Sequence, residues 1–532
     1  MEEYFLIGIG GTGARVLEAF VHCCAAGFGP KGQAVHVMLI DPDGANGNLN
    51  RTQKLVEQYR ALRSKIKPEL EPGNPAFQTE LLVPEKGFVW GIFENSSDQS
   101  GPKTLANYIG YEGLERQQPA LAAAANLLFT KQELGTPLNE GFRGHPSIGA
   151  VVMANPPLFD PQSPLRMLTA TGAANKTARM FLVGSIFGGT GAAGFPTMGK
   201  VLKQRLGEAW GSVLLGGALV LPYFSFVPDP KAEGEMFVTP ADFPGATKAA
   251  LHYYDENELD FNQYYLVGDS LSQTVGKFSP GAGTQENDPH YVELVSALAA
   301  FDFFGQGPTK PDDEKQYFVA GRKTADVGWD DLPVSRAGAS PDRRVEFRQA
   351  ISTFTLFCYT YRTLGGHYLA DIRKNGKLPD SWFRDTFNDF SAGTARTNPG
   401  HLDHSDLLDK KMMDYAAAFL TWITSMAGND HNDNGRNVKL IDRQMLLDRN
   451  AAKVDSNGQP QLPLINPPRE NLGRLVHGFL AKRNNADFVF SSLNGSARRD
   501  DTTRDAPYRL LNLFFRAAPD FLGFERSPAA AQ

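Results

Sequence analysis

The sequence predicts an α/β fold built on a parallel sheet, and two observations support that prediction. Residues 4–10 form a short apolar run that ends in glycines, a helical pattern follows, and residues 34–41 form a second apolar run that ends in an acid. The same succession of apolar run, glycine-rich loop and helical pattern returns over residues 179–206. Strands that alternate with helices in this way are typical of a parallel sheet flanked by helices.

The composition is that of a globular protein of 532 residues, with 42% hydrophobic and 21% charged residues. At roughly 150 residues per domain, this length leaves room for about three to four domains. The formal net charge of −6 argues against a partner held by bulk positive charge, so we expect no nucleic acid. Three cysteines are too few for a disulfide framework, which favours a cytoplasmic location. No stretch approaches the ~18 apolar residues of a membrane span.

The first part of the chain supplies the elements of the expected sheet. Helical spacing of apolar residues predicts a helix from Thr12 to Val21 after the first strand. The helix after the second glycine loop is expected to run to about Leu206, with Pro196 in its first turn, where a missing N–H costs nothing. Further strands are expected at 147–153, 179–185, within 212–226 and at 263–267, with a helix within 163–178.

The second part of the chain is predicted to be more helical. Residues 288–304 are apolar nearly all round, which indicates a long buried helix. Pro and Gly cluster at 305–311, and helices are expected near 345–364 and 405–427. These boundaries predict four units: a first α/β domain (1–286), a central buried helix (287–305), a second α+β domain (306–440) and a C-terminal extension (441–532).

The first glycine loop, Gly8–Gly13, has the spacing G-x-G-x-x-G between a strand and a helix. Glycines let the backbone approach a phosphate, and the helix N-terminus offers N–H donors and partial positive charge. Asp41 ends the next strand, where an acid can bind a ribose. These residues are compatible with a flavin- or nicotinamide-dependent oxidoreductase, or with a tight turn that binds nothing.

The second glycine loop, Gly188–Gly191, again follows a strand and opens a helix. A simple dinucleotide fold needs one such loop, so the second is unexplained by the oxidoreductase hypothesis. It is not a Walker A loop, because no Gly-Lys-Ser/Thr follows and the next lysine is Lys200. A nucleoside triphosphate held without that lysine must be bound by N–H groups and hydroxyls from several loops, and two glycine loops supply them.

These motifs resemble the tubulin/FtsZ superfamily, whose signature G-G-G-T-G-[ST]-G is similar to residues 187–194. Phe187 and Ala192 depart from that signature, at its first glycine and at its hydroxyl residue. Gly8–Gly13 resembles the first loop of the family, and Leu294–Ala297 is similar to the tubulin sequence in the central helix. The resemblance covers roughly residues 4–305. It implies a Rossmann-like nucleotide-binding sheet, a long central helix and a second, activation-type domain.

The resemblance also implies a set of phosphate contacts. The first loop would contact the α- and β-phosphates, and the second would wrap the β- and γ-phosphates. Ala154-Asn155-Pro156 is similar to a Gly-Ala-Asn-Pro loop of FtsZ, which lies near the γ-phosphate. The implied phosphate-binding residues are Gly10, Gly11, Thr12, Gly13, Ala154, Asn155, Gly188, Gly189, Thr190 and Gly191.

Three further residues follow the second strand, where FtsZ has an Asn-Thr-Asp stretch. Asp41, Asp43 and Asn46 would lie near the ribose or a water molecule on Mg²⁺. Turn chemistry is the alternative for Asp43 and Asn46, because each precedes a glycine. The expected ligand is GTP or GDP with Mg²⁺, and ATP remains an alternative. Val292 stands where tubulins read guanine with an Asn, so Asn287 or His290 is expected to contact the base instead.

In this superfamily an acidic loop of one subunit completes the site of the next. The resemblance therefore implies a GTPase that assembles head to tail into filaments, with Asp330 and Asp331 as catalytic candidates and Asp302 as the second choice. A second hypothesis is a non-hydrolysing nucleotide sensor or scaffold, which the lack of a hydroxyl at Ala192 favours. The C-terminal region is expected to contact protein partners, and no resident metal site is expected apart from the nucleotide's Mg²⁺.

Overall fold

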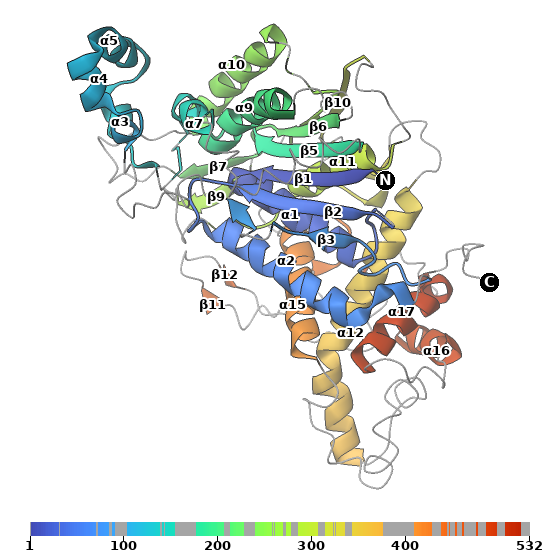
Figure 1. Ribbon diagram of the computed structural model, residues 1–532. Coiled ribbons are helices and arrows are strands. Elements are labelled where there is room, and N and C mark those ends of the chain that lie inside the picture. The colour runs from blue at the N-terminus through green and yellow to red at the C-terminus, as the bar shows by residue number, and fades with distance from the viewer. Residues whose placement is uncertain are drawn as a thin grey trace.

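The structure of the protein is a computed structural model (Figure 1). It describes residues 2–30, 32–70, 73–84, 88–90, 104–138, 141–142, 144–154, 177–206, 213–227, 240–257, 259, 261–269, 273–277, 286–306, 314–322, 324, 326–335, 343–375, 409–427, 438–443, 446, 453–454, 460–461, 475–476, 486–496 and 506–522. The structural statements below concern these residues.

An eight-stranded sheet forms the centre of the fold. Its order is β10-β8-β6-β5-β1-β2-β3, β4 also pairs with β2, and these pairs are parallel. Helices flank it, so the predicted α/β fold with a parallel, Rossmann-like sheet is confirmed. The strands are β1 (Glu3–Ile9), β2 (Ala34–Ile40), β3 (Glu80–Leu82), β4 (Val89–Trp90), β5 (Ala178–Ser185), β6 (Val213–Val220), β8 (Gln263–Val267) and β10 (Gln316–Ala320).

The strand order reverses between β1 and β5. From β1 the sheet continues to β2 and β3 on one side, and from β5 it continues to β6, β8 and β10 on the other. β1 pairs with β5 from Glu3↔Ala178 to Gly8↔Val183. At such a reversal the loops that follow the two strands diverge, and ligands of open α/β sheets bind in the crevice between them. Both glycine loops of this chain begin at that point.

Alternating side chains of β1 enter two hydrophobic cores. Tyr4 and Leu6 lie in one core, and Phe5 and Ile7 lie in the core on the opposite face of the sheet. The helices α7 and α9 contribute to the second core, and α10 lies beside α9 (Figure 1). The first core contains residues of α1, α2, α10, α11, α12, α15, α16 and α17.

The longer helices pack around the sheet or extend from it (Figure 1). They are α1 (Gly10–Ala25), α2 (Gly47–Ile66), α7 (Pro146–Met153), α9 (Gly189–Leu206), α10 (Phe243–Glu256), α11 (Tyr291–Phe304), α12 (Arg344–Asn375), α15 (Lys410–Met426), α16 (Ala486–Ser496) and α17 (Ala506–Leu522). The short elements are η1 (Pro68–Leu70), α3 (Leu105–Tyr108), α4 (Tyr111–Gln117), α5 (Pro119–Leu128), α6 (Lys131–Leu134), β7 (Phe224–Val227), η6 (Pro240–Asp242), β9 (Gln273–Lys277), η8 (Trp329–Asp331), β11 (Lys453–Val454) and β12 (Pro460–Gln461).

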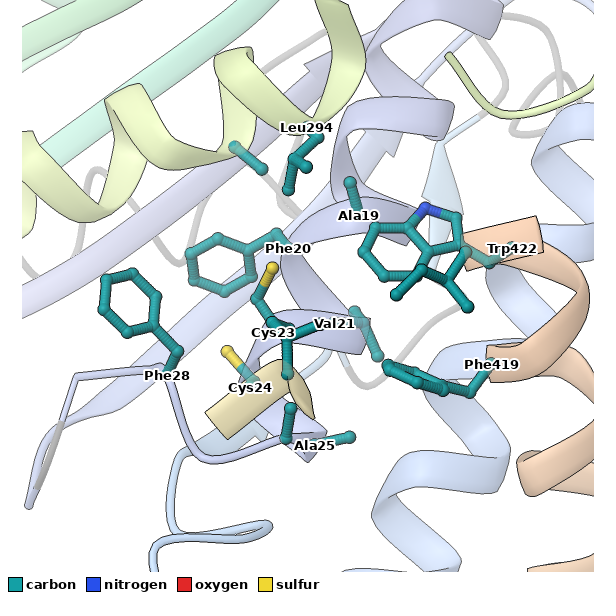
Figure 2. Close-up of a cluster of buried hydrophobic side chains, with 14 of the residues drawn as sticks. Ala19, Phe20, Val21, Cys23, Cys24, Ala25, Phe28, Leu294, Phe419 and Trp422 are labelled. Atoms are coloured by element: carbon teal, nitrogen blue, oxygen red, sulfur yellow. The ribbon is translucent and has the colours of Figure 1, made fainter. Parts of the chain in front are cut away.

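Helix α1 is enclosed by protein on all sides, and every one of its residues except Gly11 is buried. Figure 2 shows Leu294 of α11 on one side of α1, and Phe419 and Trp422 of α15 on another. The ring of Phe20 stacks on Phe301 of α11 with centroids 4.4 Å apart. The helix that follows the first glycine loop is therefore held rigidly from both sides.

Most of the predicted elements are confirmed. Four predicted strands correspond to β1, β2, β5 and β8, and the apolar run within 212–226 contains β6 and the start of β7. The buried helix expected at 288–304 is α11. The helices expected near 345–364 and 405–427 correspond to α12 and α15. The helix expected within 163–178 falls almost entirely outside the described residues.

Two local predictions are wrong. Residues 147–153 form helix α7 and not a strand. Pro146 occupies the first helical position, and Ile148 and Val152, four residues apart, are both buried, as in a helix packed on its neighbour. A short apolar run does not distinguish a strand from a buried helix. Pro196 lies inside α9, because that helix begins at Gly189 and not shortly before the proline.

The chain beyond residue 306 first returns to the main sheet. β10 pairs with β8 through Gln316↔Gln263 to Ala320↔Val267. Helices α12, α15 and α17 then pack into the same core as α1. The division into a second domain at 306–440 and an extension at 441–532 stays a prediction.

Candidate functional site

The two glycine loops are the shortest connections between strand and helix in the sheet. β1 ends at Ile9 and α1 begins at Gly10, whose φ of +74° is a conformation that favours glycine. β5 ends at Ser185 and α9 begins at Gly189. Both helices therefore direct their N-termini to the crevice where the strand order reverses.

A pair of glycines brings each helix against its own strand. A Cβ atom on Gly13 would lie 2.6 Å from the carbonyl carbon of Gly8, and one on Gly191 would lie 2.5 Å from the backbone nitrogen of Ser185. A Cβ on Gly184 would likewise meet the Cα of Gly191 at 3.3 Å. Gly13 and Gly191 thus have a packing role, which corresponds to the close helix–strand contact of dinucleotide folds.

The two loops touch one another at Gly10. A Cβ on Gly10 would lie 3.3 Å from the Cβ of Thr190 and 3.6 Å from the backbone nitrogen of Gly191. Thr190 is half-buried, as is Gly188. Gly189 packs on another segment, since a Cβ there would lie 2.8 Å from the backbone nitrogen of Gly144. The structure therefore brings the predicted phosphate residues of both loops together.

A third loop, between β2 and α2, lies against the first glycine loop. Asp43 donates its N–H to Asp41 Oδ1 at 3.0 Å, and the N–H of Ala45 donates to Asp43 Oδ1 at 3.1 Å. Asn46 caps α2, because its Oδ1 accepts from the N–H of Asn48 at 3.0 Å. The turn chemistry expected for Asp43 and Asn46 is therefore present.

The amide groups of this third loop border Gly11. A Cβ on Gly11 would lie 3.5 Å from Asn46 Nδ2 and 3.5 Å from Asn48 Nδ2. These are ordinary van der Waals distances, so the position has room for a methyl group. Gly11 thus lies beside two side-chain N–H donors and one residue away from the contact between the glycine loops.

Asp41 is only 3% exposed, and the pKa of its carboxyl is raised. Burial raises the pKa of its carboxyl to about 7, the N–H of Asp43 lowers it, and the charge of Asp43 raises it. A buried carboxyl that ionises near neutral pH is typical of functional sites. A nearby cation would favour its ionised form, which fits the predicted position beside Mg²⁺.

Asn287, the predicted base contact, is tied to the third loop by Asn48. The N–H of Asn287 donates to Asn48 Oδ1 at 2.9 Å, and Asn48 Nδ2 donates to Asn287 Oδ1 at 3.4 Å. Asn48 is fully buried, and sequence reasoning missed it, although its place beside the helix-capping Asn46 was a usable signal. His290 instead caps α11, since its Nδ1 accepts from the N–H of Val292 at 3.1 Å.

Sequence reasoning also missed a buried ion-pair network beside the first loop. Arg15 is 4% exposed and forms an ion pair with Glu293 of α11, and its Nη2 donates to the hydroxyl of Tyr223 at 2.5 Å. Tyr223 donates to Glu293 Oε1 at 2.6 Å. Tyr223 and Glu293 raise the pKa of Arg15 above its ordinary value although burial acts to lower it. A charged residue among the apolar residues of α1 was the available signal.

The catalytic candidates are not joined to this cluster by the hydrogen bonds described for them. Asp331 accepts from the N–H of Gly328 at 2.8 Å and so caps the short helix η8, while Asp330 is exposed. Asp302 lies in the last turn of α11, where its Oδ2 accepts from the hydroxyl of Tyr265 at 2.6 Å.

The last turn of α11 lies at the edge of the sheet opposite the glycine loops. Arg179, in the first part of β5, donates to the carbonyl of Phe303 at 3.0 Å, and Phe304 stacks on Tyr4 of β1. Asp302 therefore lies at the edge of the sheet opposite the glycine loops.

The residues implied near the γ-phosphate are described only in part. Ala154 is exposed and follows the last residue of α7, and Asn155 lies outside the described residues. Helix α7 packs on α9, because a Cβ on Gly149 would lie 2.5 Å from Ala193 Cβ.

Comparisons with known proteins add no family to this geometry. Within the described part of the chain, no helix combines the length and the apolar character needed to cross a bilayer. The chain matches no protein-family model, and a search of curated proteins finds no match.

Proposed function

We propose that this protein binds a nucleoside triphosphate, GTP in the first place, together with Mg²⁺ in the crevice between β1 and β5. The observation that carries the proposal is the meeting of both glycine loops at the point where the strand order reverses. Ligands of open α/β sheets bind at that point. An oxidoreductase with a dinucleotide cofactor leaves the second loop without a role.

The electrostatics of the crevice favour a polyanion. Helices α1, α2 and α9 each begin where a strand of the parallel sheet has ended, so their N-termini lie at one edge. Each N-terminus carries about half a positive charge and unpaired N–H groups. Phosphates bind readily at such termini, and no P-loop lysine is needed when several loops contribute donors.

The side-chain amides of Asn46 and Asn48 beside Gly11 are proposed as donors to the phosphate chain, and so is the hydroxyl of Thr190, whose Cβ lies against Gly10. Asp41, with Asp43 beside it, is the carboxylate suited to hold a water molecule on Mg²⁺, because its pKa of about 7 allows ionisation once a cation is near. Asn287 is proposed to contact the base, held in place by Asn48.

The binding proposal is tested with one substitution in each glycine loop. Gly11→Val adds a side chain beside the donors of Asn46 and Asn48, and Thr190→Val removes one hydroxyl without changing the shape of the residue. Gly113→Ala in α4 is the control, since a Cβ there meets nothing within 4 Å. We expect GTP affinity to fall more than tenfold in Gly11→Val, to fall less in Thr190→Val and to stay unchanged in the control. Unchanged affinity in both site variants would refute the site.

We further propose that the protein hydrolyses the nucleotide and assembles head to tail, with an acid of one subunit completing the site of the next. A repeated heterologous contact that does not close gives a filament. The three acids available are Asp302, Asp330 and Asp331. Asp302 has the position at the opposite edge that such an arrangement requires, and we propose it as a candidate together with the two residues of η8.

The alternative of a non-hydrolysing nucleotide sensor is favoured by the lack of a hydroxyl at Ala192 and by the carboxylate of Asp331, which already caps its own turn. Phosphate release measured over a range of protein concentrations separates the two functions. Specific activity that rises with concentration, and that Asp302→Asn or Asp330→Asn abolishes, supports hydrolysis between subunits. Bound nucleotide with no release at any concentration supports the sensor.

A further inference from the structure

The buried guanidinium of Arg15 lies directly beside the first glycine loop. Its Nε donates to Glu293, and its Nη2 donates to Tyr223. Its Nη1 is 3.9 Å from the place where a Cβ on Gly11 would lie. One side of the guanidinium is thus bound to protein partners, and another of its nitrogens lies next to the backbone that is proposed to hold the phosphates.

Arg15 also fixes the hydroxyl of Thr12, a residue of that same loop. Arg15 Nη2 donates to Thr12 Oγ1 at 3.4 Å, a long but directed contact. An oxygen that accepts from a guanidinium keeps its own hydrogen for another acceptor. The Thr12 hydroxyl is therefore set to donate, and a phosphate oxygen in the crevice is the acceptor that suits it.

Arg15 and its partner Glu293 both lie near the positive ends of helices. Arg15 lies near the positive N-terminus of α1, and Glu293, its partner, is in the first turn of α11. Glu293 is the one carboxylate described in contact with Arg15, and it also accepts from the N–H of His290 at 2.8 Å as the cap of α11. The guanidinium and the helix N-terminus beside it would attract an anion in the crevice, and Glu293 offsets part of that attraction.

We infer that Arg15 is a positioning residue that makes the site select for the charge of the phosphate chain, and so for a nucleoside triphosphate over a diphosphate. This inference rests on the proposed function. Arg15 acts through the Thr12 hydroxyl and through its own field on the crevice, and Glu293 sets how much of that field is cancelled. A purely structural ion pair would affect all nucleotides alike.

The test is the ratio of the dissociation constants of GDP and GTP, measured by calorimetry at fixed Mg²⁺ for the full chain and three variants. The double variant Arg15→Met/Glu293→Gln removes both charges of the ion pair. It should lower the preference for GTP over GDP about tenfold. Arg15→Lys keeps the charge and should retain most of the preference. Glu293→Gln leaves the cation uncompensated and should raise the preference, so that the double and single variants move the ratio in opposite directions.

The outcomes separate this inference from the proposed function. Wild-type protein that binds no nucleotide refutes the proposed function, and this inference with it. Wild-type protein that binds GTP, with a ratio unchanged in the double variant or in Glu293→Gln, refutes the role of Arg15 alone. If the double variant does not fold, as circular dichroism reports, Glu293→Gln decides the question: a raised preference for GTP supports the role of Arg15, and an unchanged ratio refutes it.

Discussion

The ionisation of Asp41 provides a direct test of the site geometry, because its carboxyl is only 3% exposed and its pKa is raised by burial from 3.8 to about 7. In the unfolded chain the carboxyl loses its proton above pH 3.8, whereas in the folded protein it keeps the proton up to about pH 7. The stabilising contribution is therefore complete below pH 3.8 and is lost as the pH rises through 7. Asp41→Asn removes this dependence.

The size of the effect follows from the difference between the two pKa values. That difference corresponds to about 4 kcal/mol in total, of which about 2.5 kcal/mol falls between pH 5 and pH 8. For a chain of 532 residues, this is a change of about 2 °C in melting temperature, since the entropy of unfolding is about 1.1 kcal/mol per kelvin.

The assay is urea unfolding of wild type and Asp41→Asn at pH 5 and pH 8, without nucleotide. We expect the variant to gain about 2.5 kcal/mol relative to wild type between the two pH values. Other titrating groups contribute to both proteins and cancel in the difference. A difference that is equal at both pH values would show that the pKa of Asp41 is not raised in the folded protein, and the argument for its role beside Mg²⁺ would fail.

Three further predictions concern other buried positions. Burial lowers the pKa of His22 from 6.5 to about 3, so the free energy of unfolding falls as the pH drops from 6.5 toward 3. His22→Leu should remove about 2 kcal/mol of this loss between pH 7 and pH 5, measured by urea unfolding. Gly13→Ala should destabilise by about 1–3 kcal/mol, and Gly113→Ala in α4 should stabilise by about 0.5–1 kcal/mol; equal effects in thermal melts would contradict the packing argument. Asn48→Ala should cost about 1–3 kcal/mol by leaving the N–H of Asn287 unpaired, and should weaken GTP binding; affinity equal to wild type would separate Asn48 from the site.

The fold was predictable from the sequence because its strongest signals are local. Apolar runs that end in glycines or an acid gave β1, β2 and β5, and the helix that is apolar all round gave α11. The prediction of a strand at 147–153 is wrong, because a buried two-turn helix and a buried strand have the same short apolar pattern. Pro196 was misplaced because a proline in a helix interior looks in sequence like one at a helix start.

The site was predictable only where a motif marks it. The two glycine loops have recognisable spacing, and the structure brings Gly10 against Thr190. Arg15 and Glu293 are far apart in the chain, so their ion pair depends on the packing of α1 against α11, which no local pattern encodes. Asn48 is a similar case, since its importance lies in a hydrogen bond to a distant segment.

Nucleotide binding by the wild-type protein is the most direct test of the central claim that the crevice between β1 and β5 holds a nucleoside triphosphate. The measurement is titration of the full chain with a fluorescent GTP analogue, with and without Mg²⁺, followed by competition with unlabelled GTP and ATP. We predict saturable binding of one nucleotide per chain that requires Mg²⁺ and is displaced by GTP at lower concentration than by ATP. A folded protein that binds neither triphosphate in a saturable manner would contradict the claim.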